Sequence, residues 1–400
     1  MTKAGHPHFS DPCHGFLPGG QFVVQPTGTG TLDGLRFAVK DLINIAGYRT
    51  GGGNPDWLAA SRPAERHAII VSQLLNAGGQ LIGKTVTDEL AFSLEGVNAH
   101  YGTPVNPRNS AWLPGGSSSG SAVVTAAGLV DFAVGTDTGG SVRVPAAFCG
   151  IFGFRPSHGA LRMQGVLPFA PGYDTPGWFS RDAQTLRAVG HALFPAGKVR
   201  PITRIRLVED GLDHVALDVA RDIRHGAAAI TTHAPVRLFE NMSLDLFQQV
   251  YAVVQGFEIG QALGERIATI RPKFDASIEQ RFAGALTLRE DDYRAACETR
   301  RTIAAHIAAL CPPDTALILP VVSQRHLNTN ADPDLIAAFY AKTLGLTAVA
   351  GHAGAPQVQM GLPANVQRVG LSLLGARNAD LPLLDLAVRL SMQAGGFDGC

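Results

Sequence analysis

Two serines in this chain of 400 residues occupy tight turns from which a hydroxyl group could attack a carbonyl carbon. The run from Pro114 to Ala160 contains two Gly-Gly-Ser sequences, which present Ser117 and Ser141 and are joined by small residues. Charged side chains are rare in this run, whereas a flexible Gly/Ser linker is polar and solvated throughout. We therefore predict that the run is buried and ordered.

A serine hydroxyl is a weak nucleophile at neutral pH and needs a base within hydrogen-bond reach. His158 is the histidine nearest to the two turns in the sequence, so a Ser-His-Asp triad of Ser141, His158 and Asp137 is one interpretation. The Gly-x-Ser-x-Gly elbow of such enzymes is absent around Ser141. A phosphate-binding loop is another interpretation, but neither Gly-Lys-Ser/Thr nor Gly-x-Gly-x-x-Gly occurs here. Both interpretations are therefore disfavoured.

The motifs GGSSSGSA and GTDTGGSVRVPAAFCGIFGFRPS resemble the signature of the amidase signature family of serine hydrolases. In that family an upstream lysine, a serine that follows a cis peptide bond and a nucleophilic serine form the catalytic triad. The resemblance assigns these roles to Lys40 in FAVKD, to Ser117 and to Ser141, whose spacing agrees with the family pattern. Ser119 replaces the usual second glycine of the first turn.

Three further stretches narrow the resemblance within the family. GGGNPDW, GKTVTDELAFSLEGVNAHYGTPVNP and YDTPGWFSRD look most like the plant indole-3-acetamide amidases and their compact bacterial relatives. The resemblance is strong from about Leu35 to Asp182 and returns weakly in the C-terminal third.

The implied mechanism makes Lys40 the proton reservoir. A neutral Lys40 accepts the proton of Ser117, which in turn takes the proton of Ser141 as that oxygen attacks. An ordinary lysine has a pKa near 10.4, so Lys40 must be buried to be neutral at pH 7. The flanking Phe37-Ala38-Val39 is consistent with burial. Because a charge on Asp41 would favour the protonated lysine, we expect Asp41 to point elsewhere.

Backbone N–H groups of the second turn are the expected oxyanion donors, because glycine permits a turn that aims several of them at one point. The residues concerned are Thr138, Gly139, Gly140 and Ser141. Asp137 and Arg143 flank this turn and are expected to make structural hydrogen bonds. By position in the family, the candidate substrate contacts are Ala91, Phe92 and Tyr173.

The order of predicted elements favours an α/β fold. The apolar segment 35–39 reads as a strand that ends at Lys40, residues 64–79 as a helix stopped by Gly78-Gly79, and residues 80–85 as a second strand. Residues 119–127 could begin a helix and 131–137 a buried strand. This alternation predicts a mixed sheet with helices on both faces.

The domain organisation is predicted as one large amidase domain over residues 31–400, with its signature core at about 114–160. The first thirty residues lack periodicity and are interpreted as a loosely attached arm. Residues 244–311 read as long helices whose Arg/Glu pairs, such as Glu265-Arg266 and Glu298 with Arg300-Arg301, are interpreted as solvated faces without function.

Composition excludes several classes of partner. Lys plus Arg and Asp plus Glu number 33 each, which removes the basic footprint of a nucleic-acid binder or of a protein held on an anionic membrane. The N-terminus has no apolar signal segment, and five separated cysteines favour free thiols in a reducing compartment. We therefore expect a soluble cytoplasmic protein, with a homodimer left open as its assembly. The cysteines are Cys13, Cys149, Cys297, Cys311 and Cys400.

Neither a metal nor an organic cofactor is required by this chemistry. His6, His8, Cys13 and His14 could hold a metal in principle, but no second ligand group of suitable spacing follows, so a metal site is disfavoured.

The leading functional prediction is a stand-alone hydrolase of a small, aryl-containing amide such as indole-3-acetamide or phenylacetamide. Carbamates, anilides and esters share the same acyl chemistry and stay open as substrates. Two further functions also stay open: a glutaminase subunit of a tRNA-dependent amidotransferase, and a non-catalytic amidase-like docking domain. The intact set of Lys40, Ser117 and Ser141 argues against the docking domain.

Overall fold

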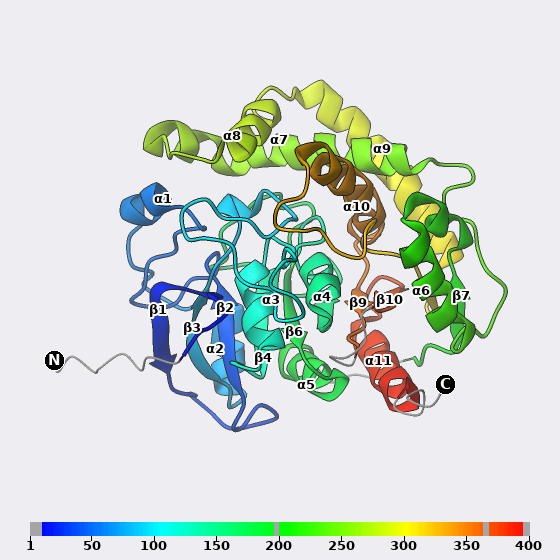
Figure 1. Ribbon diagram of the computed structural model, residues 1–400, viewed down its shortest axis with the longest axis horizontal. Coiled ribbons are helices and arrows are strands. Elements are labelled where there is room, and N and C mark those ends of the chain that lie inside the picture. Colours follow the sequence, from blue (N-terminus) through cyan, green and yellow to red (C-terminus); the bar gives the residue numbers. More distant parts are fainter. Residues whose placement is uncertain (1–9, 196–199, 363–367, 395–400) are drawn as a thin grey trace.

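The strand that ends at Lys40 lies inside a large mixed sheet (Figure 1). The computed structural model describes residues 10–195, 200–362 and 368–394. Within them the ten-stranded sheet has the order β1-β3-β2-β4-β6-β5-β9-β10-β8-β7. The strands are β1 (Phe16–Val24), β2 (Arg36–Lys40), β3 (Gln80–Thr85), β4 (Phe132–Thr136), β5 (Phe152–Arg155), β6 (Pro176–Ser180), β7 (Arg204–Leu207), β8 (Thr315–Ile318), β9 (Gln357–Gln359) and β10 (Ser372–Gly375).

Parallel pairing brings the ends of β2 and β4 together. Strand β2 pairs in parallel with β3 on one side and with β4 on the other, where Val39 lies opposite Val134. Both strands are continuous apolar runs, as expected where helices cover both faces of a sheet. Lys40 and the turn after β4 therefore meet at the carboxyl edge of the sheet, where α/β folds build their sites.

Helices cover both faces of this sheet, as the sequence predicts. On one face α5 (Ala183–Leu193) packs against α2 (Ile69–Asn76) and α11 (Asp380–Ala394). On the other face α3 (Ser119–Ala126) packs against α4 (Arg143–Cys149). Figure 1 shows α3 and α4 in front of the central strands.

Helix α2 is shorter than predicted. It begins at Ile69, whereas the apolar pattern suggests a start near residue 64. Residues 64–68 are held by other backbone groups: the N–H of Ala64 donates to Tyr48 and that of Ala68 donates to Asn44. These hydrogen bonds hold the segment against a neighbouring loop, so the helix begins only at Ile69.

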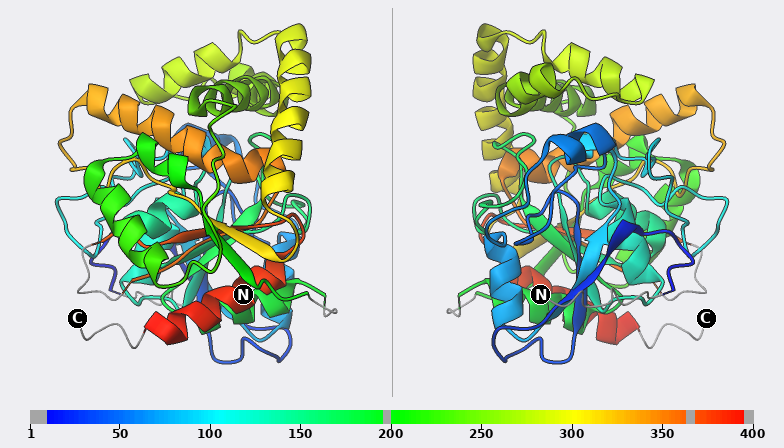
Figure 2. Two further views of the ribbon diagram at one scale, coloured as in Figure 1. Left: turned by 90° about the vertical axis from the view of Figure 1, so that its right-hand side faces the viewer. Right: turned by 90° about the vertical axis from the view of Figure 1, so that its left-hand side faces the viewer.

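Four helices form a further layer over one end of the molecule (Figure 2). They are α7 (Leu244–Ile270), α8 (Ala276–Ala285), α9 (Glu290–Leu310) and α10 (Pro333–Ala353). Helix α10 packs against both α7 and α9, and its residues from Thr343 to His352 are all buried. Such an all-round buried helix lacks the amphipathic period by which helices are recognised in sequences, so the sequence does not predict α10. The remaining elements are the helices α1 (Pro55–Ala60) and α6 (Leu217–Ala228) and the short 3₁₀ turns Glu89–Ala91 and Glu209–His214.

Part of the segment interpreted as a loosely attached arm, residues 1–30, belongs to the sheet, while residues 1–9 lie outside the described residues. Residues 16–24 form β1, which pairs antiparallel with β3. The side chains of Phe16 and Phe22 are buried, with exposed fractions of 6% and 2%. Burial of these two rings anchors the segment despite its glycines, so the domain includes this part of the arm.

Two arginines of the helical layer lie over aromatic rings: Arg266 is exposed, as expected for a solvated face, whereas Arg300 is half-buried. The guanidinium of Arg266 lies over the ring of Trp57 at 4.3 Å from its centroid, and that of Arg300 lies over Tyr173 at 3.9 Å. Arg301 and Glu298, by contrast, form an exposed ion pair, as predicted.

Among the described residues, no helix combines the length and the apolar character needed to span a lipid bilayer. The four described cysteines are free thiols, and the described part of the chain holds no group of three or more potential metal ligands. His6, His8 and Cys400 lie outside the described residues.

Candidate active site

Lys40 lies at the centre of a buried cluster of hydroxyl groups. Its Nζ donates hydrogen bonds to Ser117 Oγ at 2.7 Å and to Thr136 Oγ1 at 3.0 Å. The side chain is completely buried, with an exposed fraction of 0%. Strand β2 therefore presents the lysine to the first Gly-Gly-Ser turn, as the sequence predicts.

Burial makes Lys40 a weak base. Removal from water disfavours the ammonium form and lowers the pKa of Lys40 from 10.5 to about 7. The carboxylates of Asp88, Asp137 and Asp174 oppose this effect but do not cancel it. Asp41 does not contribute, because its carboxylate pairs with Lys84 at 2.7 Å, which confirms that it points elsewhere.

The first serine turn is held by its backbone. The peptide bond between Gly116 and Ser117 is cis. The carbonyl oxygen of Ser117 accepts hydrogen bonds from Thr87 Oγ1 at 2.9 Å and from the N–H of Asp88 at 3.2 Å. These contacts orient Ser117 so that its hydroxyl faces Lys40.

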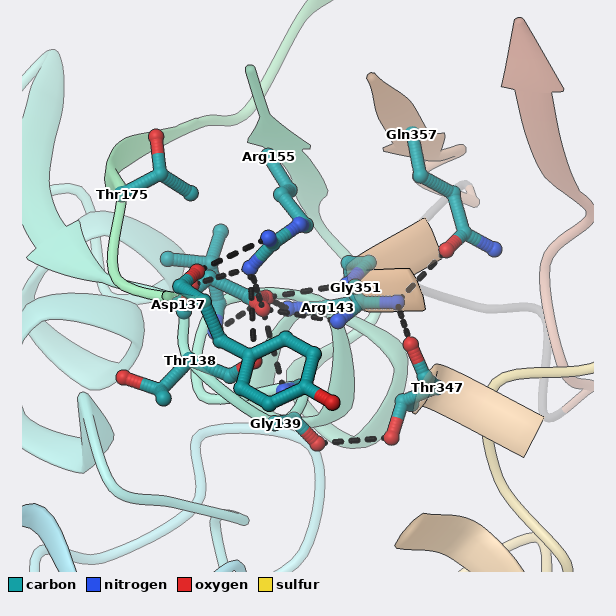
Figure 3. A network of polar contacts seen from close by, with 12 residues as sticks. Asp137, Thr138, Gly139, Arg143, Arg155, Thr175, Thr347, Gly351 and Gln357 are labelled. Carbon is teal, nitrogen blue, oxygen red and sulfur yellow. Dashed lines mark hydrogen bonds and ion pairs between the residues drawn. The ribbon is translucent and has the colours of Figure 1, made fainter. Parts of the chain in front are cut away.

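The second serine turn is organised by the carboxylate of Asp137 (Figure 3). One oxygen accepts from Arg143 Nη2 at 2.7 Å and from Arg155 Nη1 at 3.0 Å. The same carboxylate accepts backbone N–H groups of Gly140, Val142 and Arg143. The two guanidiniums and these bonds hold the pKa of Asp137 well below its usual range. Asp137 and Arg143 thus make structural hydrogen bonds, as expected.

Ser118 joins the two turns. Its N–H donates to the carbonyl oxygen of Ser141 at 3.2 Å, and its hydroxyl donates to the carbonyl oxygen of Thr136 at 3.2 Å. The turn that carries Ser141 is thereby fixed beside the turn that carries Ser117. The structure brings together the three residues that the sequence singles out.

The four N–H groups that we expect to be oxyanion donors differ in their hydrogen bonding. The N–H of Gly140 donates to Asp137 at 3.0 Å. The N–H groups of Thr138, Gly139 and Ser141 make no hydrogen bond with any described residue. The carbonyl oxygen of Gly139 is held on the opposite side by Thr347 Oγ1 at 2.6 Å (Figure 3), which fixes the orientation of the turn.

A pocket opens beside Ser141. Its wall combines apolar side chains with hydroxyl and carboxamide groups from distant parts of the chain. The lining residues are Ala91, Ser93, Leu94, Thr138, Gly139, Ser141, Phe169, Gln255, Tyr340 and Leu344.

Comparison with known proteins agrees with this geometry. The family model described as Amidase matches residues 25–200. Amidase 1 of Arabidopsis thaliana is 35% identical over 408 residues, which cover 92% of this chain and 96% of that protein. This chain belongs to the amidase family. It is accordingly an amide hydrolase.

Two further relatives show the range of this family. The translocon at the outer membrane of chloroplasts 64 of Pisum sativum is 31% identical to this amidase, over 90% of this chain and 66% of that protein. A solved structure described as a crystal structure of amidase superposes with a TM-score of 0.79 at 26% identity, covering 91% of this chain and 85% of that chain. The mixed sheet with its helices is thus the fold of the family.

The three candidate substrate contacts of the amidase lie in different places. Ala91 lines the pocket. Phe92 packs behind it, with its ring edge-on to that of Phe169 at 5.1 Å. Tyr173 has an exposed fraction of 0%, lies outside the pocket lining, and contacts His352 through its hydroxyl at 3.2 Å.

The pocket also contains residues that the sequence does not reveal. Gln255 comes from α7, and Tyr340 and Leu344 come from α10. Their contribution depends on contacts between segments far apart in the chain, for which no local motif exists. Ser93 lies close to the predicted Ala91 and Phe92, and its position in that stretch is the one available signal.

A buried carboxylate that the sequence does not single out adjoins the pocket. Asp88 accepts hydrogen bonds from the hydroxyl of Ser93, from the N–H of Gly96 at 3.0 Å and from Ser119 Oγ at 3.4 Å. Burial raises the pKa of Asp88 to about 6, although these bonds and Lys40 oppose that rise. Ser119, the departure from the family motif, thus adds a hydroxyl group to this carboxylate.

The Ser-His-Asp interpretation finds no support. The ring of His158 interacts with the carbonyl oxygen of Pro171 at 2.8 Å, and no hydrogen bond joins it to Ser141 in the described chain. Asp137 is engaged by two arginines instead of a histidine. Lys40, by contrast, is hydrogen-bonded directly to the hydroxyl of Ser117.

Proposed function

We propose that this amidase hydrolyses a small, aryl-containing primary amide, of the indole-3-acetamide or phenylacetamide type, to a carboxylate and ammonia. The proposal uses Ser141 as nucleophile, Ser117 as proton relay and Lys40 as base. One observation carries it: Lys40 is fully buried, has a pKa of about 7, and lies 2.7 Å from Ser117 Oγ.

The first half of the reaction acylates the enzyme. Ser141 Oγ attacks the amide carbon while its proton passes to Ser117 Oγ, and the proton of Ser117 passes to the neutral Lys40 amine. The C–N bond then breaks, and the proton returns along the same route to the departing nitrogen, which leaves as ammonia. Transfer of the serine proton to a positioned base during attack is the general way in which a serine nucleophile is activated.

The second half releases the acid. A water molecule attacks the acyl-Ser141 ester and gives its proton to the same relay. The ester bond breaks and Ser141 Oγ regains a proton, which restores the starting state. In both halves the N–H groups of Thr138, Gly139 and Ser141 would stabilise the negative oxygen, and loss of one such donor typically costs about 10²- to 10³-fold in rate.

The apolar side chains in the pocket wall support a substrate with an aromatic acyl group. Phe169 and Leu344 supply apolar wall, and Phe92 backs Phe169 edge-on. The resemblance to plant indole-3-acetamide amidases favours the same class of substrate.

The test is ammonia release by the purified chain from indole-3-acetamide, phenylacetamide, benzamide, short aliphatic amides and glutamine. We expect arylacetamides to be hydrolysed, and Ser141→Ala to lose at least about 10⁵-fold in kcat, as happens when a serine nucleophile is removed. Thr125→Ala, a buried hydroxyl on α3 that donates to Ser121 O at 2.8 Å, is the matched control and should keep its activity.

Different results would favour a different function. Turnover confined to carbamates, anilides or esters would keep the mechanism and change the substrate. Glutamine hydrolysis that requires partner subunits would indicate an amidotransferase subunit. A folded protein that reacts with none of these compounds, and whose Ser141→Ala variant behaves identically, would indicate a docking domain.

A further inference from the structure

Gln255 is a buried polar side chain that has no hydrogen-bond partner among the described residues. It lies on α7, lines the pocket beside Ser141, and has an exposed fraction of 6%. Its carboxamide makes no hydrogen bond with any residue in the described ranges. The carboxamide is therefore free to form a hydrogen bond with a ligand in the pocket.

The other polar groups of the pocket wall indicate which kind of ligand group would match. The hydroxyl of Ser93 donates its proton to Asp88, and that of Thr138 donates to Asp174 Oδ1 at 2.6 Å. A hydroxyl has a single proton, so these two oxygens can only accept further hydrogen bonds. Away from the N–H groups of the turn that carries Ser141, these two oxygens favour ligands that carry hydrogen-bond donors.

The carboxamide of Gln255 can satisfy the same preference. Rotation about its last side-chain bond presents either the oxygen or the NH₂ group to the pocket. Ser93 and Thr138 line the same pocket and donate their protons to the carboxylates of Asp88 and Asp174. The negative charge of these carboxylates favours a hydrogen-bond donor on the ligand over an acceptor. The Gln255 oxygen is then the group that receives it.

We propose that Gln255 is a specificity-determining residue, which accepts a hydrogen bond from an N–H or O–H group on the aromatic acyl part of the substrate. This proposal rests on the proposed function of the site. Phe169 and Leu344 provide the apolar surface for the ring, and Gln255 distinguishes a ring that carries a donor from one that does not. The preferred class is thus an arylacetamide with a donor on its ring system.

Two nearly isosteric substrates test the proposal. Indole-3-acetamide carries a ring N–H, and benzothiophene-3-acetamide has sulfur in that place. Gln255→Met keeps the length of the side chain and removes its hydrogen-bonding groups. We expect this variant to lower kcat/KM for indole-3-acetamide about 10-fold and to change that for benzothiophene-3-acetamide less than about twofold.

A matched control lies on the same helix. Gln249 belongs to α7 and is exposed, so Gln249→Met should leave both substrates unchanged. An equal loss for both substrates in Gln255→Met would overturn the proposal, because it would show that Gln255 only fills space. No change for either substrate would overturn it as well.

A binding measurement tests the role of Gln255 separately from the proposed function. If the parent protein hydrolyses neither amide, calorimetric binding of the two compounds to the parent and to Gln255→Met replaces kinetics. A preference for the indole that disappears in the variant would support the role of Gln255 despite the missing turnover. Equal affinities, or binding of neither compound, would overturn it.

Discussion

Asp137 and Lys40 are both completely buried beside Ser141, yet their surroundings differ in kind. Asp137 is enclosed by two guanidiniums and three backbone N–H groups, and its pKa lies well below the ordinary value. Within the described residues Lys40 donates to two hydroxyl groups and no carboxylate, and its pKa falls to about 7. Burial alone therefore does not determine charge. Partners of opposite charge preserve the charge of Asp137, whereas neutral partners allow Lys40 to lose it.

The largest expected effect is the loss of catalytic activity when Lys40 is replaced. Lys40→Met should lower kcat/KM at least about 10³-fold, because the relay loses its base. The melting temperature should stay the same or rise, because a buried lysine destabilises the fold in a way that methionine does not. Amide hydrolysis and thermal unfolding measure both. A Lys40→Met variant that loses both its activity and its folded structure would contradict this prediction.

Replacement of Asp137 should mainly lower the stability of the fold. Asp137→Asn leaves Arg143 and Arg155 without their anion, so the free energy of unfolding should fall by about 3–5 kcal/mol in a denaturant titration. Glu298→Gln disrupts an ion pair with Arg301 in which both side chains are about 70% exposed, and should lower the free energy of unfolding far less than Asp137→Asn. Equal losses of unfolding free energy in the two variants would show that burial of Asp137 and its arginines does not determine their contribution to stability.

The turn between these two sites gives a third prediction. A Cβ atom at Gly139 would lie 2.5 Å from Tyr251 Oη and 2.9 Å from a methyl group of Leu344. Gly139→Ala should displace the turn and lower kcat about 10²-fold. Adding Tyr251→Phe removes the nearest atom and should restore part of the loss.

The control for this third prediction is another glycine. A Cβ atom at Gly284, on α8, would meet no atom within 4 Å. Gly284→Ala should keep full activity, and an equal loss in the two variants would refute the steric explanation.

The smallest effect is the dependence on pH. Because the pKa of Lys40 is lowered, the neutral amine dominates above about pH 7, so kcat/KM should rise about tenfold per pH unit below 7 and level off above it. The unfolded chain binds a proton at this lysine up to about 10.5, so its contribution to stability also increases from pH 7 to 10.5. Rates that continue to rise toward pH 10 would show that Lys40 keeps an ordinary pKa.

The sequence predicts the chemical centre better than the pocket. Strands β2 and β3 and the helix between them follow from apolar runs ended by glycines, and the two serine turns follow from a dense motif. These signals are local. The pocket wall, by contrast, includes Gln255 and Tyr340, which reach Ser141 only because α7 and α10 pack together.

Two other differences have equally definite causes. Strand β1 escapes prediction because its glycines hide the anchoring role of Phe16 and Phe22, which depends on pairing with β3. Tyr173 is expected near the substrate by its position in the chain, but its ring is covered by Arg300 and lies in the core. In both cases a contact between distant segments decides the outcome.

The origin of the pocket wall in α7 and α10 has a consequence for protein engineering. Lys40, Ser117 and Ser141 all come from the first part of the chain. Under the proposed function, a combinatorial library at Gln255, Tyr340 and Leu344 would therefore alter the fit of the acyl group without changing the proposed proton relay. Thr347 must be kept in such a library, because its hydroxyl holds the carbonyl oxygen of Gly139. New substrate ranges are thus accessible by selection at a few helix positions.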